Sequence, residues 1–344
     1  QKTRDNQTFI TEIILLGFEG LHGIRTLVFF LLLLIYFVTI CGNLLIIIVV
    51  SYSKNLQSPM YFFLTQLSIS DIMLTTSIVP NLLHIILHEV GRMPLENCII
   101  QFNVFVFSEC SECLLLTVMS YDRYLAICKP LHYFSVMNHS LCMRLAGVSW
   151  LLSIFAMLMS TITLTSLDYC GPNIIDHFFC DVSPMLKLSC SDVFMVQAAM
   201  VFLGVPILFL PFIFIVISYI YVIFNILKIP STTGKQKAFS TCSSHLTVVC
   251  IFYATLISNY GVPHIGRLVN VSKSLSLLYT LGTPLMNPII YSLRNNEMKT
   301  AFVKLFNSEI CYFLTSCLFD LNVPHNLHLV LFLQAVACLS VFKG

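Results

Sequence analysis

The chain has 344 residues, of which 57% are apolar and only 10% are charged. Soluble domains carry about a quarter charged residues, and this composition, with a mean hydropathy of +0.88, excludes a soluble enzyme, a nucleic-acid-binding protein and a disordered regulator. The net charge of +2 is too small to indicate an acidic partner by itself, so the question is how often the chain crosses a membrane.

A membrane-spanning helix needs about 20 mainly apolar residues. Five stretches of such length lack Asp, Glu, Lys and Arg, and two more are interrupted only by acidic residues. Because irregular backbone is unstable against lipid, each stretch is predicted to be a helix. The sequence therefore predicts an all-α membrane protein with one seven-helix domain over residues 1–306, its helices at about 26–52, 59–87, 97–127, 143–167, 195–227, 238–261 and 274–293.

The loop charges set the expected orientation. With the N-terminus outside, ten Lys and Arg residues lie on the inner side and seven on the outer side, as the positive-inside rule favours. Asn6 opens a glycosylation sequon, which agrees with an extracellular N-terminus, whereas a second sequon at Asn138 lies on the inner side. We expect a multi-pass plasma-membrane protein, and we expect the native start to precede Gln1.

Four cysteines fall on the outer side, where disulfides persist: Cys98, Cys170, Cys180 and Cys190. Four cysteines allow three pairings, and the sequence does not choose among them. His177 and Asp181 flank Cys180 and could ligate a soft metal with it, but a disulfide-bonded cysteine is no thiolate ligand. We therefore predict disulfides and no metal site.

Three acidic residues lie inside the apolar stretches. Glu112 is eleven residues from Arg123, or roughly 16 Å into the membrane at ~1.5 Å per residue, and Asp71 and Asn43 lie at similar depth. We expect Asn43, Asp71 and Glu112 to meet at the midplane. Two carboxyl groups so close either share a proton and lock two helices together, or hold a cation such as sodium.

Glu109 is one helical turn outward from Glu112, on a similar face. That places it near an outward-opening cavity. It either contacts a ligand or hydrogen-bonds to Ser108 or Ser111, and we slightly favour the hydrogen bond.

Four strings now coincide in order and on successive helices. They are PMYFFL with LSISD from Pro59 to Asp71, MSYDRYLAICKPL from Met119 to Leu131, KAFSTCSSHL from Lys237 to Leu246, and PLMNPIIYSLRN from Pro284 to Asn295. Together they make the chain resemble an olfactory receptor, a branch of the rhodopsin-like G-protein-coupled receptors, over about residues 6 to 306. No enzymatic activity is expected: neither HExxH nor GxSxG occurs.

The resemblance implies roles for matching residues. Cys98 pairs with Cys180 and Cys170 with Cys190. The family also carries a glutamate at the position of Glu112. The switch and coupling residues on the cytoplasmic side are Asp122, Arg123, Tyr124, Tyr219, His245, Asn287, Pro288 and Tyr291. The implied partner is a heterotrimeric G protein of the olfactory stimulatory type, acting through cyclic AMP, while basic inner residues also suit anionic lipid heads.

An outward-facing ligand pocket is expected between the helices. Helical spacing from the motifs nominates Phe105, Val106, Glu109, Cys110, Leu203, Ile207, Tyr253, Leu256, Ile257, Tyr260, Leu277 and Thr280. This mostly apolar set suits small, volatile, hydrophobic odorants held by burial.

The C-terminal end departs from the family. Met298, Ala301, Phe302, Leu305 and Phe306 form an apolar stripe typical of a short interfacial helix. Residues 307–344 form an atypical tail that we expect to be aberrant. The alternatives to an odorant receptor are therefore a non-functional receptor gene product or a membrane transporter, although the chain shows no internal repeat.

Overall fold

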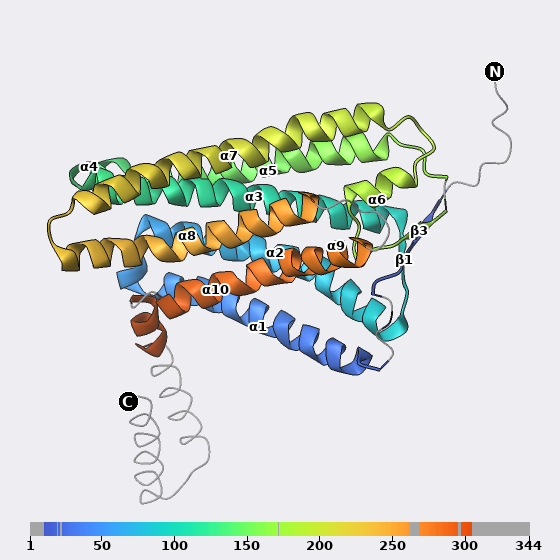
Figure 1. The fold of residues 1–344 in the computed structure, drawn as a ribbon, viewed down its shortest axis with the longest axis horizontal. Coiled ribbons are helices and arrows are strands. Elements are labelled where there is room, and N and C mark those ends of the chain that lie inside the picture. Colours follow the sequence, from blue (N-terminus) through green and yellow to red (C-terminus); the bar gives the residue numbers. More distant parts are fainter. Residues whose placement is uncertain are drawn as a thin grey trace, which may run out of the picture.

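The computed structural model describes residues 10–18, 20, 23–170, 172–261, 268–294 and 297–304. In this part of the chain six helices are long and apolar enough to cross a membrane. They are α1 (Arg25–Tyr52), α2 (Pro59–His88), α3 (Leu95–Cys128), α5 (His139–Thr165), α7 (Phe194–Lys228) and α8 (Thr232–Gly261). Figure 1 shows them running lengthwise as one bundle. The expectation of a membrane helix bundle is confirmed for these six.

The remaining helices are shorter. A continuous rod consists of α9 (Leu268–Leu277), the π-helical η2 (Leu278–Gly282) and α10 (Thr283–Arg294), and it packs against α1, α2 and α8. Residues 297–304 form a further helix. Two short helices that the sequence did not predict, α4 (Pro130–Val136) and α6 (Val182–Lys187), lie in the connections, and η1 (Lys54–Leu56) joins α1 to α2.

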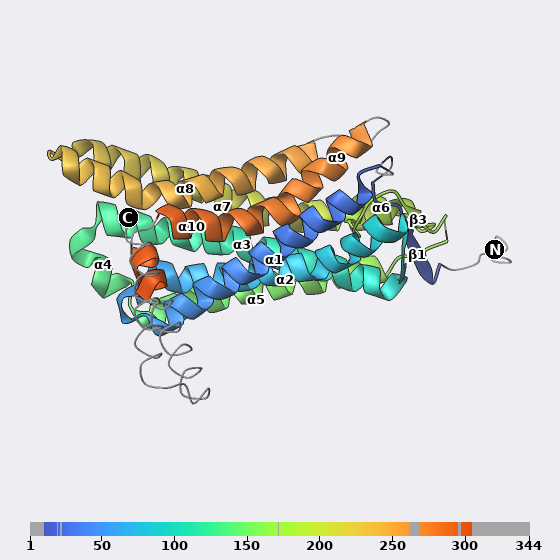
Figure 2. The same cartoon turned by 90° about the horizontal axis from the view of Figure 1, so that it is seen from below.

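Helix α3 is the central element of the bundle. It contacts α2, α5, α7 and α8, and in Figure 2 it lies between α7 and α8 on one side and α2 and α5 on the other. By contrast, α1 and α7 expose many large apolar side chains, including Phe30, Phe37, Phe202 and Phe224. An outer surface this apolar is the surface that lipid covers, so the composition of each helix reflects its distance from the bundle axis.

Several helix ends differ from the apolar stretches that predicted them. Helix α8 begins at Thr232 rather than 238, and α5 begins at His139 rather than 143, where the Asn138 side chain accepts a hydrogen bond from Leu141 N at 2.9 Å. A hydropathy stretch ends where charge begins. A helix can continue beyond the membrane until its terminal backbone groups are capped, so it is longer than the apolar stretch that predicted it.

A small sheet corrects the prediction of an all-α protein. Strand β1 (Glu12–Leu15) pairs antiparallel with β2 (Gly91–Pro94) and parallel with β3 (Ile174–Ile175). Ile13 and Leu15 are fully buried. The strands are too short to show as periodic patterns in a chain this apolar. The sheet covers one end of the bundle (Figure 1).

Helix α1 approaches α10 closely at Gly42. A Cβ atom at Gly42 would lie 3.0 Å from Pro288 Cβ, so a larger residue would push the helices apart. The next residue, Asn43, donates hydrogen bonds from Nδ2 to Pro284 O at 3.1 Å and to Thr39 O at 3.0 Å. Pro288 has no backbone N–H, so the helical turn before it lacks one hydrogen bond. The contacts of Gly42 and Asn43 hold α10 against α1 at that turn.

Candidate functional site

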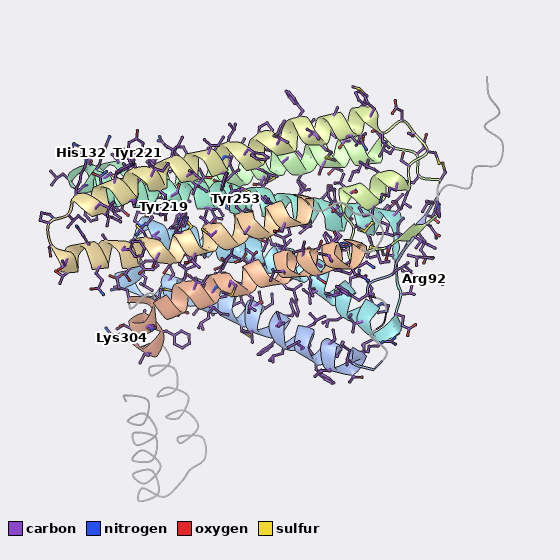
Figure 3. All side chains as sticks on the ribbon, viewed as in Figure 1. Arg92, His132, Tyr219, Tyr221, Tyr253 and Lys304 are labelled. Carbon is purple, nitrogen blue, oxygen red and sulfur yellow. A yellow bond between two sulfur atoms is a disulfide. The ribbon has the colours of Figure 1, made fainter. Side chains whose placement is uncertain are left out.

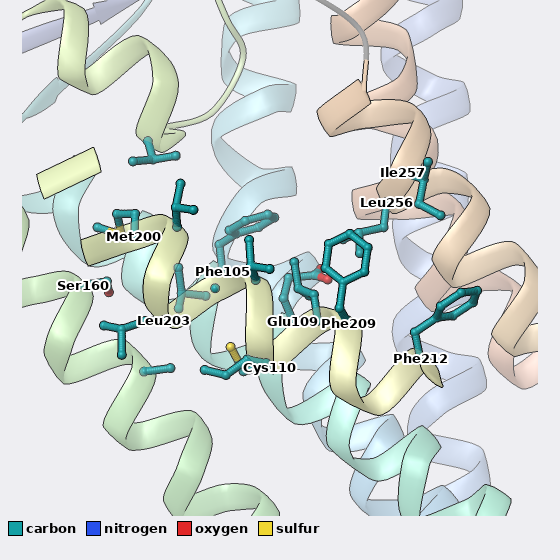
Figure 4. A pocket seen from close by; sticks show the side chains of 18 of the residues that line it. Phe105, Glu109, Cys110, Ser160, Met200, Leu203, Phe209, Phe212, Leu256 and Ile257 are labelled. Carbon is teal, nitrogen blue, oxygen red and sulfur yellow. The ribbon is translucent and has the colours of Figure 1, made fainter. Parts of the chain in front are cut away.

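A cavity of about 500 Å³ lies between α3, α5, α7 and α8. Figure 4 shows its walls, with Phe105, Glu109 and Cys110 from α3 facing Leu203 and Phe209 from α7. Nine of the predicted pocket residues line it: Phe105, Val106, Glu109, Cys110, Leu203, Ile207, Tyr253, Leu256 and Ile257.

Three predicted pocket residues have a different outcome. The side chain of Tyr260 lies outside the described part of the chain. Leu277 and Thr280 are not among the lining residues, and the Thr280 hydroxyl donates to Ser276 O at 2.8 Å within its own helix. Tyr279 lines the cavity instead. The prediction assumed a regular α-helix, whereas the π-helical turn at 278–282 rotates the face that points inward.

Helix α5 and the outer loop supply lining residues that sequence reasoning missed, namely Ala156, Ser160 and Val182. Small residues on α5 carry no periodic signal, and Val182 belongs to an unpredicted helix. The Ser160 hydroxyl is not free, since it donates to Asn103 Oδ1 and to Met157 O, both at 2.8 Å.

The Glu109 carboxylate lies in the cavity wall without a hydrogen bond. The residue is 5% exposed, and within the part of the chain that the structure describes neither Oε1 nor Oε2 has a hydrogen-bond partner. The expected hydrogen bond to Ser108 or Ser111 is therefore wrong. Ser111 Oγ shares a 2.6 Å hydrogen bond with Ser70 Oγ of α2 and also lies 2.8 Å from Ser108 O. The Ser111 hydroxyl is therefore already engaged and does not bond to Glu109.

The end of the cavity nearer the sheet is covered by the loop before α7. The structure joins Cys98 to Cys180 and Cys170 to Cys190. Cys180 N donates to Gln101 Oε1 at 3.0 Å, and the adjacent Phe179 ring packs against Phe105 with centroids 5.4 Å apart. The first disulfide thus holds an aromatic side chain over the ring that lines the cavity.

A buried lysine ties three segments at this end. Lys273, on α9, is 1% exposed; its Nζ donates to Gly17 O at 2.6 Å and forms an ion pair with Asp176. Gly17 has φ +51°, and a Cβ there would lie 2.4 Å from Ile85 Cγ2, so only glycine fits. Sequence reasoning counted Lys273 only as an outer-side charge, because burial of a lysine depends on partners distant in the chain.

The expected midplane cluster forms with different members. Asp71 Oδ2 accepts a 2.8 Å hydrogen bond from Asn287 Nδ2, and Glu112 lies beside both residues. Asn43 is not hydrogen-bonded to this cluster, because it is engaged with Pro284 of α10. The prediction used only the depth of Asn43 in the membrane. Depth does not determine which neighbour a side chain faces, because that depends on how α1 is rotated about its own axis.

The C-terminal end of α3, opposite the sheet, carries a buried ion pair. Arg123 Nε donates to Asp122 Oδ2 at 3.0 Å, and Tyr133 of α4 donates to Asp122 Oδ1 at 2.8 Å. The Asp122 side chain is fully buried and that of Arg123 is 9% exposed. Burial raises the pKa of Tyr133 above its usual range, and the Asp122 carboxylate adds to the rise, so the hydroxyl stays protonated and donates.

The halves of α3, α7 and α8 that lie farther from the sheet are linked through His245. Tyr219 Oη lies 2.7 Å from His245 Nδ1, and His245 Nε2 lies 3.2 Å from Leu116 O. Figure 3 labels Tyr219 between α7 and α8 toward the end opposite the sheet. Tyr124 packs against Tyr121 and Tyr221, and the buried Tyr291 hydroxyl has no hydrogen-bond partner.

Some predicted features lie outside the described residues: Asn6 with its sequon, and 305–344 with the atypical tail. Among the described residues, no group of three or more His, Cys, Asp and Glu side chains is placed to hold a metal ion.

Comparison with known proteins gives one consistent result. A family model described as olfactory receptor matches residues 32–309. Olfactory receptor 11L1 of Homo sapiens is 43% identical over 304 residues, which is 88% of this chain and 94% of that protein. Olfactory receptor 1468 of Rattus norvegicus is 40% identical over 303 residues, which is 88% of this chain and 96% of that protein.

Proposed function

This chain belongs to the olfactory receptor family, and from that premise we propose that it binds small hydrophobic odorants and activates a heterotrimeric G protein. The carrying observation is the apolar cavity between α3, α7 and α8, whose central wall, α3, also carries the Asp122–Arg123 pair at its inner end. Burial of an apolar ligand in such a cavity supplies most of the affinity.

The proposed topology has seven crossings, with the rod 268–294 as the seventh and the N-terminus outside. The two disulfides and the sheet lie at one end of the bundle, where an oxidising environment favours them. Arg92 lies at that end, while His132 and Lys304 lie at the opposite end in Figure 3. The helix 297–304 suits the inner membrane surface, because Met298 and Ala301 are buried while Lys299 and Lys304 are exposed.

Activation is proposed as a population shift. An odorant that binds better when the inner end of α8 has moved away from α3 favours that arrangement. The movement separates His245 from Leu116 O and uncovers Arg123 for the G protein. The proposed partner is the olfactory stimulatory G protein, so the cell responds with a rise in cyclic AMP.

Arg123→Ala is expected to abolish odorant-dependent cyclic AMP while surface staining of an N-terminal epitope persists. Arg123 is the charged group at the inner end of α3 that coupling would use. The assay uses cells that express residues 1–306 behind a start Met, across an odorant panel. Arg144→Ala is the matched control, because Arg144 is an exposed inner-side arginine on α5. Equal responses of the Arg123→Ala variant and the unmodified receptor would refute the coupling role.

The cluster of Asp71, Asn287 and Glu112 is proposed to hold a shared proton or a sodium ion. Asp71 Oδ1, Glu112 Oε1 and Asn287 Oδ1 are buried oxygens without hydrogen-bond partners, a donor set that suits a small hard cation. Such a cation would hold α2, α3 and α10 together.

Replacing choline chloride by NaCl at constant ionic strength is expected to raise the Tm of the purified receptor by a few degrees. The Asp71→Asn variant should lose that increase, because it removes one of the two carboxylates. Identical Tm values in the two salts would exclude sodium and leave the shared proton.

A further inference from the structure

We propose that the cavity selects a protonated aliphatic amine, whose ammonium group pairs with the Glu109 carboxylate while its alkyl chain lies against α7 and α8. The proposal rests on the proposed odorant-binding function and narrows the ligand to one chemical class.

The first support is the state of Glu109 itself. Both carboxyl oxygens are buried and find no hydrogen-bond partner among the described residues, although Glu109 lines an accessible cavity. Buried carboxylates are costly without a partner, and natural proteins rarely leave both oxygens of one unpaired. A group that enters the cavity and donates hydrogen bonds to Glu109 supplies what the fold does not.

The second support is the charge balance around the cavity. The carboxyl groups of Glu112 and Asp71 are the charged groups that act on Glu109 from α3 and α2. Among the described residues, no lysine, arginine or histidine lines the cavity. The buried lysine and arginine among the described residues are engaged elsewhere, since Arg123 pairs with Asp122 and Lys273 with Asp176. A ligand cation therefore meets only acidic groups, whereas a carboxylate ligand would be repelled.

The third support is the lining around Glu109. Tyr279 also lines the cavity, and its buried hydroxyl has no hydrogen-bond partner among the described residues, so it is a candidate second acceptor for an ammonium group that carries three donors. Phe105, Phe209 and Phe212 present rings that favour a cation over an anion. In Figure 4 the Glu109 oxygens appear among carbon side chains, with Phe209 and Leu256 beside them. A chain of about six carbons fits well within about 500 Å³.

The test compares n-hexylamine with n-hexanol, which share chain length but differ in charge at pH 7. Both are added to purified full-length receptor for Tm and to expressing cells for cyclic AMP. The unmodified receptor should bind hexylamine at least about tenfold more tightly than hexanol, because a charge-assisted hydrogen bond is the added interaction. Glu109→Gln should weaken the binding of hexylamine by about tenfold to a hundredfold and leave the affinity for hexanol unchanged.

Glu96→Gln is the matched control. This variant makes the same chemical change on the same helix, at an exposed position in the first turn of α3 outside the cavity. The affinity for both ligands should therefore stay unchanged. The ligand-free Glu109→Gln receptor should also have a Tm equal to or above that of the unmodified receptor, since the substitution removes a buried acidic group that lies beside Glu112 and Asp71.

The outcomes separate the two proposals. Hexylamine that raises Tm without cyclic AMP supports the amine site and contradicts the proposed signalling. A response to hexanol but not to hexylamine overturns the amine site and keeps the receptor function. Equal hexylamine affinity in the unmodified receptor and the Glu109→Gln variant, or no Tm increase with hexylamine at all, also overturns the amine site.

Discussion

Asp122→Ala is expected to destabilise the receptor by about 3–5 kcal/mol and to raise basal cyclic AMP. Removing one partner of a buried ion pair leaves the other charge without compensation, and the Arg123 side chain is only 9% exposed. The hydroxyl of Tyr133 loses its acceptor as well. Thermal unfolding of the purified receptor measures the first effect, and cyclic AMP in the absence of odorant measures the second.

The double variant Asp122→Ala with Arg123→Met provides the control. A buried ion pair exchanged for apolar side chains is often neutral or stabilising, so most of the lost stability should return. The raised basal cyclic AMP of the single variant should be absent from the double variant, because Arg123 is the proposed coupling group. If the single and double variants unfold at the same temperature, an unpaired Arg123 charge is not the cause of the instability.

Cys98→Ser is expected to remove most receptor from the cell surface. The Cys98–Cys180 disulfide closes a sequence separation of 82 residues, and loss of a native disulfide costs about 2–5 kcal/mol. The same bond positions Phe179 against Phe105, so the cover of the cavity loosens with it. Surface staining and thermal unfolding of the purified protein measure the loss.

Cys170→Ser is the matched comparison, because that disulfide spans only 20 residues within one loop. The chain-entropy model makes its removal less costly by about 1 kcal/mol, and no cavity-lining ring depends on it directly. A Cys170→Ser variant as depleted from the surface as Cys98→Ser would show that loop folding, rather than the tether to α3, controls export.

The positions of the membrane helices could be read from the sequence. The helices predicted at 26–52, 59–87 and 195–227 begin and end within one residue of those bounds. A crossing must satisfy its backbone hydrogen bonds internally and present about 20 apolar residues to lipid, and both demands are local. The nine nominated residues that line the cavity follow from the same regularity, since α3, α7 and α8 keep helical spacing beside the cavity.

The tertiary structure decided which partner each polar group finds. Asn43 bonds to Pro284 rather than joining Asp71, and Ser111 bonds to Ser70 rather than to Glu109. Each choice depends on how far one helix is rotated about its axis relative to another. This rotation is set by packing across the whole bundle, so the sequence of one helix does not predict it.

The sequence by itself determined the family motifs, the membrane helices and which cysteines share a side, because these depend on composition and order along one segment. Only the tertiary structure turned Tyr279 instead of Thr280 into the cavity, buried Lys273 and left Glu109 without a hydrogen-bond partner among the described residues. Those outcomes depend on groups up to 256 residues apart along the chain, as for Lys273 and Gly17. Contacts at such separations form only when the bundle closes.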